Sequence, residues 1–149
     1  MPAHTEIREL PYNCESIFDL VIDIRKYPEF LPWCLKMQVH RDEPDFILAD
    51  MLIGFKFFRE SFTSQVHYSR PASINIKYES GPFTYLENEW KFETVNNGHT
   101  QLKFHVDFEF RSIIFQKAIG VVFNEAVTRM VSAFETRAAE LYTRNNLIS

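Results

Sequence analysis

The sequence contains few of the residues that build disulfide frameworks, metal sites or phosphate-binding loops. Of its 149 residues only two are cysteine and four are glycine. Cys14 and Cys34 are too few for a disulfide framework and do not follow the spacing of a zinc site, which favours a reducing compartment. No Gly-rich phosphate loop is visible. These absences argue against several large classes of enzyme.

Long apolar runs and a basic charge balance are also missing. No apolar run approaches the roughly 18 residues of a membrane-spanning helix, and the N-terminus lacks the basic and apolar regions of a secretory signal. The expectation is a cytoplasmic protein. The formal charge of −4 disfavours nucleic acid as a partner, so we expect no DNA binding.

Aromatic residues, by contrast, are abundant. The chain has 15 phenylalanines, 6 tyrosines and 2 tryptophans. Side chains of this size can fill a core completely, or they can line a cavity for an apolar ligand. Composition alone leaves both alternatives open.

Apolar periodicity predicts one domain covering residues 1–149, with one strand, two short helices, six strands and a long helix in that order. Asn13 is placed as the N-cap of the first helix. Helical spacing of apolar residues over 113–142 predicts the long helix. Short, turn-rich connections favour an antiparallel meander. The expected strands cover residues 5–10, 35–41, 46–53, 58–68, 74–79, 85–94 and 101–111.

The last strands alternate between apolar and polar residues. Phe104, Val106 and Phe108 point to one face, and Lys103, His105 and Asp107 to the other. One side of the sheet is therefore predicted to be covered by helix while the other meets water. The fold class is α+β, a curved antiparallel sheet wrapped around a long C-terminal helix.

One run of residues is specific enough to suggest a family. The chain resembles the coenzyme Q-binding protein family at residues 27–34, which read Tyr-Pro-Glu-Phe-Leu-Pro-Trp-Cys. Five shorter pieces support the resemblance: Gly54–Lys56, Arg59–Phe62, Gly81–Phe83, Trp90–Phe92 and Phe134–Ala138. This START-like family belongs to the polyketide cyclase and lipid transport superfamily, and some bacterial relatives carry a ribosome association toxin label. The resemblance implies a helix-grip fold that binds ubiquinone or a related isoprenoid lipid as its ligand, without a cofactor and without catalysis.

The period of each element selects the residues expected to line a ligand cavity. For any one of them a solid core is the simpler alternative. Asn88 lies on the apolar face, where its amide could donate to a quinone carbonyl or bond to a water or neighbouring backbone group. The expected ligand-binding residues are Phe30, Trp33, Met51, Ile53, Phe62, Val66, Tyr78, Asn88, Trp90, Phe104, Phe123 and Met130.

Two further hypotheses concern charged residues. Glu60 and Arg137 both fall on inward registers, which predicts a buried ion pair because either charge alone would be costly there. The connection Phe55, Lys56, Phe57 and Phe58 combines aromatic rings with a cation. It is interpreted either as a loop that dips into the inner face of a membrane or as a cap on the core.

Catalytic and metal-binding patterns are not apparent. The five histidines are scattered, and none forms a recognised metal motif. The sequence therefore predicts no catalytic residues, no metal and no enzyme activity. The main interpretation is a carrier or chaperone that presents ubiquinone to respiratory-chain or quinone-biosynthesis proteins. The alternatives are a ribosome-associated growth regulator and, less favoured, an aromatic cyclase.

Overall fold

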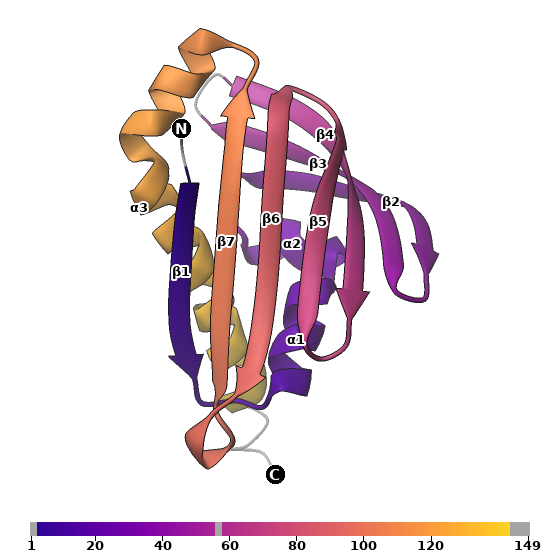
Figure 1. Cartoon of the computed structure of the whole chain (residues 1–149), viewed down its shortest axis with the longest axis vertical. Coiled ribbons are helices and arrows are strands. Elements are labelled where there is room, and N and C mark those ends of the chain that lie inside the picture. The colour runs from indigo at the N-terminus through magenta and orange to yellow at the C-terminus, as the bar shows by residue number, and fades with distance from the viewer. Residues whose placement is uncertain (1–2, 56–57, 144–149) are drawn as a thin grey trace.

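One seven-stranded antiparallel sheet forms the framework of the computed structural model, which describes residues 3–55 and 58–143. The strand order is β1-β7-β6-β5-β4-β3-β2, so β2 to β7 form a meander and β1 joins it beside β7. Register shifts within three strand pairs bend the sheet. Figure 1 shows β2, β3 and β4 turned across the direction of β6 and β7. The strands are β1 (Ala3–Leu10), β2 (Cys34–Glu43), β3 (Phe46–Phe55), β4 (Phe58–Ser69), β5 (Ser73–Ser80), β6 (Phe83–Thr94) and β7 (Thr100–Phe110).

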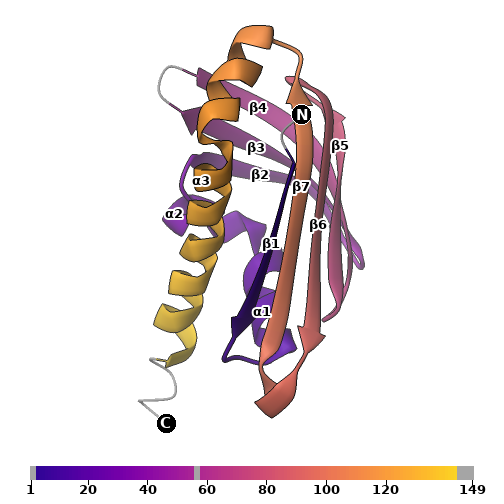
Figure 2. The ribbon, with the colours of Figure 1, turned by 60° about the vertical axis from the view of Figure 1, so that its left-hand side comes forward.

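Helices cover one face of this sheet, as Figure 2 shows. Helix α1 (Cys14–Ile22) begins at Asn13, whose side-chain oxygen accepts a hydrogen bond from the Ser16 N–H at 2.8 Å. A 3₁₀ turn (Ile24–Lys26) leads into α2 (Tyr27–Phe30), a single turn with proline in its first positions. Helix α3 (Ile113–Ala138) is capped by Ser112 and ends in a π-helical turn (Ala139–Thr143).

The two halves of the covered face are packed differently. Helices α1 and α2 and the last turns of α3 lie over one half (Figure 2). There the Phe18 and Phe92 ring centroids are 5.6 Å apart, and those of Phe134 and Trp90 are 5.0 Å apart. These side chains are buried and fill that half of the interior. Over the other half the first turns of α3 face the sheet without α1 or α2 beneath them.

A polar network attaches the edge strand β1 to α3. The Arg8 guanidinium donates through Nη1 to Ser132 Oγ and to Glu135 Oε1, both at 3.1 Å. Arg8 Nη2 also donates to Glu6 Oε2 at 2.9 Å, and the second carboxylate oxygen of Glu6 lies 2.7 Å from His4 Nε2. The two bonds from Nη1 cross from sheet to helix and hold α3 over the covered face, and the bonds of Glu6 with Arg8 and His4 lie within β1. We refer to all of these bonds as the β1–α3 strap.

The predicted element order and the helix-grip arrangement are confirmed. Strict alternation along the expected strand 35–41 points Leu35 inward together with Met37 and Val39, and for Leu35 this prediction is wrong, because the residue is 43% exposed. A bulge between Cys34 and Lys36 shifts the alternation at the start of β2, which a strict period of two does not anticipate. Among the described helices, none combines the length and apolarity needed to cross a bilayer.

Candidate functional site

A cavity of about 230 Å³ lies between the sheet and the first half of α3. Alternation along β7 places Phe104, Val106, Phe108 and Phe110 on the same wall. The opposite wall comes from residues three and four apart on α3. The whole cavity is lined by Trp33, Ile53, Gly54, Phe55, Phe58, Phe62, Phe83, Leu86, Phe104, Val106, Phe108, Phe110, Ile119, Val122, Phe123, Ala126, Val127 and Met130.

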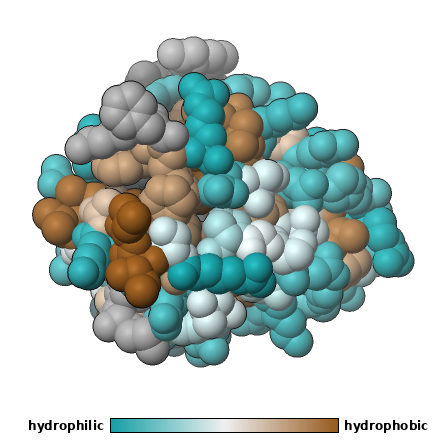
Figure 3. All heavy atoms as spheres, turned by 90° about the horizontal axis from the view of Figure 1, so that it is seen from above, coloured by the Kyte–Doolittle hydropathy of each residue, from teal (hydrophilic) through white to brown (hydrophobic). Residues whose placement is uncertain are grey.

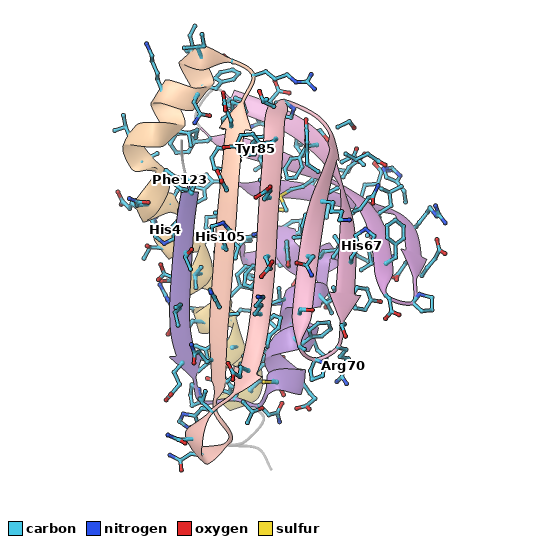
Figure 4. The ribbon with its side chains drawn as sticks, viewed as in Figure 1. His4, His67, Arg70, Tyr85, His105 and Phe123 are labelled. Carbon is cyan, nitrogen blue, oxygen red and sulfur yellow. The ribbon has the colours of Figure 1, made fainter. Side chains whose placement is uncertain are left out.

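The space exists because small and medium side chains of α3 face large rings that pack against each other. Phe83 stacks on Phe110 with ring centroids 4.6 Å apart, and Phe108 meets Phe123 at 5.1 Å. These contacts hold the rings against the walls. Across from them α3 presents Ala126, whose methyl group cannot reach far into the interior. Figure 4 labels Phe123 where α3 passes beside β1.

The cavity opens where its lining residues are only half-buried. On the sheet side most of them lie where β2 begins, β3 ends and β4 begins, and on α3 they include Ile119 and Ala126; the sheet-side residues are Trp33, Ile53, Gly54, Phe55, Phe58 and Leu86. The deeper residues on β7 are buried. The mouth of the cavity therefore lies between the middle of α3 and the place where β2 begins and β3 ends.

Trp33 is held at this mouth in an unusual backbone conformation. Its φ of 67° lies in the left-handed region, which costs energy for a residue with a large side chain. The Trp33 carbonyl accepts a hydrogen bond from the Gly54 N–H at 2.9 Å. A Cβ on Gly54 would lie 2.5 Å from Leu35 Cδ1, so a larger residue at this position would have to push the exposed Leu35 side chain aside. The Arg129 guanidinium lies 5.8 Å from the Trp33 ring centroid, and Arg129 is exposed.

The chemistry of the cavity wall is uniformly apolar. None of the lining residues named above carries a titratable side chain. Such a wall favours a hydrocarbon or ring over water, and any polar atom placed deep inside would lose its hydrogen bonds. A polar group of a ligand is therefore best accommodated at the mouth, where the Arg129 guanidinium can donate.

Two titratable groups close to Trp33 in the sequence, the Cys34 thiol and the Tyr27 hydroxyl, belong to buried residues. Burial raises the pKa of the Cys34 thiol to about 11, so the thiol stays protonated at neutral pH. Burial also raises the pKa of Tyr27, whose hydroxyl donates to the Val21 carbonyl. Tyr27 begins α2 and Cys34 begins β2, and both contribute to the packing of the core.

Half of the predicted ligand-binding residues line the cavity and the other half lie elsewhere. The structure brings six of them together around the cavity: Trp33, Ile53, Phe62, Phe104, Phe123 and Met130. Phe30 and Trp90 instead pack on Phe134. Val66 is buried and Met51 half-buried in the filled core, while Tyr78 and Asn88 line a separate polar hollow between β5 and β6.

The Asn88 amide has a protein partner. Its Nδ2 donates to the His105 carbonyl at 2.9 Å. Of the two alternatives for this residue, the bond to neighbouring backbone is therefore the one observed.

The predicted Glu60–Arg137 ion pair is wrong. Arg137 Nη2 donates to Glu29 Oε1 at 3.0 Å, and its guanidinium lies 5.1 Å from the Phe30 ring centroid. Glu60 pairs across the sheet with Ile53. Arg137 is in the last turn of α3, next to α2, whereas Glu60 is near the start of β4 over the first half of α3. Glu60 and Arg137 were both expected to point into the interior, but they lie at different ends of α3 and do not meet.

The aromatic connection between β3 and β4 is only partly described. Lys56 and Phe57 lie outside the described residues. Phe55 packs on Trp33 with centroids 6.1 Å apart, and Phe58 on Phe115 at 4.4 Å. Phe55 and Phe58 both line the cavity. Their rings therefore face the interior, as the alternative interpretation of a core cap expects.

Several lining residues lie outside the expected ligand-binding set, including Val127 on α3 and Leu86 and Phe83 on β6. Alternation along β7 would have found Val106, Phe108 and Phe110. The pattern could not say which half of the sheet is open, because that depends on where α1 and α2 pack.

The remaining polar residues do not gather at the cavity. Figure 4 shows His67 on β4 well apart from His4 and His105, which lie on the neighbouring strands β1 and β7. Within the described residues no three His, Cys, Asp or Glu side chains are grouped so that they could hold a metal ion.

Comparison with known proteins agrees with this architecture. Residues 10–135 match the family described as polyketide cyclase / dehydrase and lipid transport. The ribosome association toxin RatA of Rickettsia prowazekii is 37% identical over 93% of this chain and 95% of its own length. The mitochondrial coenzyme Q-binding protein COQ10 homolog B of Xenopus laevis is 30% identical over 97% of this chain and 61% of its own length.

A solved structure of a START superfamily protein from Mycobacterium smegmatis superimposes with a TM-score of 0.80 at 18% identity, covering 93% of this chain and 98% of that one. At this identity the likeness concerns the fold alone. Family match, relatives and fold lead to the same assignment: the chain belongs to the START-like polyketide cyclase / dehydrase and lipid transport family.

Proposed function

We propose that this chain binds ubiquinone or a related isoprenoid lipid and presents it to respiratory-chain or quinone-biosynthesis proteins. The observation that carries the proposal is the cavity of about 230 Å³ with its wholly aliphatic and aromatic lining. The name of the Xenopus laevis relative, a coenzyme Q-binding protein, supports the choice of ligand. We propose that this takes place in the cytoplasm, at the inner face of a membrane.

The size of the cavity limits how the ligand is held. Ligand pockets commonly measure about 300–1,000 Å³, so this one accepts a ring or a short stretch of chain. A longer isoprenoid would extend through the mouth or displace the first half of α3. We place the oxygenated ring at the mouth, where Arg129 donates to it, because the inner wall offers a carbonyl no partner.

We propose no catalytic role. Cyclisation or dehydration needs a positioned acid or base within reach of the substrate. The residues that line the described cavity supply neither. The name of the family includes polyketide cyclases, so turnover remains the alternative outcome of a direct assay with aromatic polyketide substrates.

The decisive experiment is organic extraction of the protein purified from its native host, followed by mass spectrometry. We expect close to one quinone or isoprenoid lipid per chain. Recovery of a phospholipid would replace the proposed ligand. Empty protein that also fails to take up a short-chain ubiquinone from detergent would refute the proposal.

A second candidate function has specific support. The relative from Rickettsia prowazekii covers nearly the whole chain at 37% identity and is named for ribosome association. We propose this as the alternative function. Sedimentation of the protein with ribosomal subunits through sucrose gradients at low and high salt tests it, because contacts with RNA phosphates weaken steeply as salt rises.

A further inference from the structure

The outward side of the first turns of α3 is apolar. Ile113, Ile114 and Val121 are 71%, 77% and 85% exposed. At 100° per residue these three side chains fall within about 100° of each other around the helix axis, with Lys117 between them. Further along the helix the same side becomes polar, with exposed Asn124, Glu125 and Thr128. The apolar side therefore has a clear end. We call the outward side of residues 113–121 the α3 apolar face.

Positive charge accompanies this face. Residues 111–124 contain Arg111 and Lys117, both exposed, and no aspartate or glutamate. The nearest carboxylates in the sequence, Glu109 and Glu125, lie on either side of the segment. This is unusual in a chain with a net charge of −4. Exposed apolar side chains between cations suit an interface with anionic lipid headgroups.

The same turns of α3 contribute to the cavity. While Ile114 and Val121 point outward, Ile119 and Val122 face inward and line its wall. Figure 3 views this end of the molecule, where strongly hydrophobic residues are exposed beside hydrophilic ones. The exposed apolar side chains and the cavity wall therefore belong to the same part of α3, on opposite sides of the helix.

We propose that the α3 apolar face docks on the surface of an anionic bilayer, so that the mouth of the cavity opens next to the lipid. This deepens the proposed function and rests on its placement of the chain at the inner face of a membrane, although docking does not require the cavity to be occupied. A bilayer fits better than a second copy of the chain. A symmetric dimer centred on this face would bring Lys117, which lies in its middle, close to the Lys117 of the other copy.

Flotation with lipid vesicles tests the proposal. The probes are vesicles of phosphatidylcholine alone and of phosphatidylcholine with 30 mol% phosphatidylglycerol. We expect the native chain to float with the anionic vesicles, less so as salt rises. Ile114→Glu and Val121→Glu should each reduce partitioning by about tenfold or more, because each replaces a side chain that enters the interface with a charge. Lys117→Glu should reduce it by a comparable factor.

The matched control is Ile7→Glu on β1, which makes the same exchange at a residue that is 57% exposed and whose side chain alternates with those of Glu6 and Arg8, so that it points away from the face of β1 that contacts α3. It should float like the native chain. All four replacements lie at exposed positions, and Ile114→Ser provides a milder variant if Ile114→Glu unfolds.

Three outcomes would overturn the proposal: no binding to anionic vesicles, an equal loss in Ile7→Glu, or a native dimer that Ile114→Glu converts to a monomer. Ligand content is measured in the same preparations. Retained ligand with lost vesicle binding in the Ile114→Glu variant supports the docking face, and empty protein that still floats refutes only the proposed function.

Discussion

At the scale of single residues, Ala126 has the most direct control over the cavity. It lines the wall on α3 and is half-buried, so a larger side chain can enter without displacing a buried group. We expect Ala126→Trp to fill the cavity and lower the bound lipid per chain by about tenfold or more. The melting temperature should stay the same or rise, since filling a void restores contacts. Extraction and mass spectrometry measure the lipid. Ala118→Trp, at an exposed position on the same helix, is the control and should leave binding unchanged.

Arg129 supplies a second prediction at this scale. Its guanidinium lies over Trp33 at the mouth, where it can donate to a quinone carbonyl. Arg129→Gln should weaken binding of a short-chain ubiquinone by about tenfold, the size expected for one lost charge-assisted hydrogen bond. Binding of a hydrocarbon of equal length, which lacks carbonyls, should not change. Equal effects on both ligands in a fluorescence titration would show that the ring does not lie at the mouth.

At the scale of elements, the β1–α3 strap makes stability depend on pH. The hydrogen bond with His4, followed by those from Arg8, holds the pKa of Glu6 below its ordinary value, against the opposing effect of burial. Because the folded-state pKa is lower than the unfolded one, ionised Glu6 stabilises the fold above pH about 4.3, and this contribution is lost as pH falls through the lowered value.

Glu6→Gln should therefore lower the free energy of unfolding by about 1 kcal/mol at pH 7 and by progressively less below pH 4. Urea unfolding at a series of pH values measures this. Glu9→Gln on the same strand removes an exposed contact with His99 and should change stability by less than about 0.5 kcal/mol. A constant difference between native and Glu6→Gln protein down to pH 3 would contradict the assignment.

The elements themselves were largely predictable from sequence. Asn13 was placed correctly as a helix cap because a short polar side chain before an apolar helical stripe has a local cause. The β7 face was equally clear, since each of its alternate residues is buried. Leu35 was misplaced because a bulge is set by the partner strand, whose register is not visible in the residues of β2.

At the scale of the whole molecule, ligand binding should stabilise the fold. A ligand that binds only the folded state at 100 times its dissociation constant adds about 2.7 kcal/mol. For a chain of this length that corresponds to a rise in melting temperature of about 5–10 °C. Differential scanning fluorimetry with a short-chain ubiquinone measures the shift. The Ala126→Trp variant should show almost none, and a full shift in that variant would place the ligand outside the cavity.

The sequence by itself determined the order of the elements, the covered face of the sheet and the long C-terminal helix, because each depends on local periodicity and short-range turn chemistry. Only the tertiary structure decided where the interior is open. Phe18 and Phe134 fill one half of the covered face because α1, α2 and the end of α3 meet there. The other half is covered only by the first turns of α3. Arg137 donates to Glu29 rather than to Glu60 because the last turn of α3 lies next to α2. Contacts between distant segments set these features, and no pattern within one segment contains them.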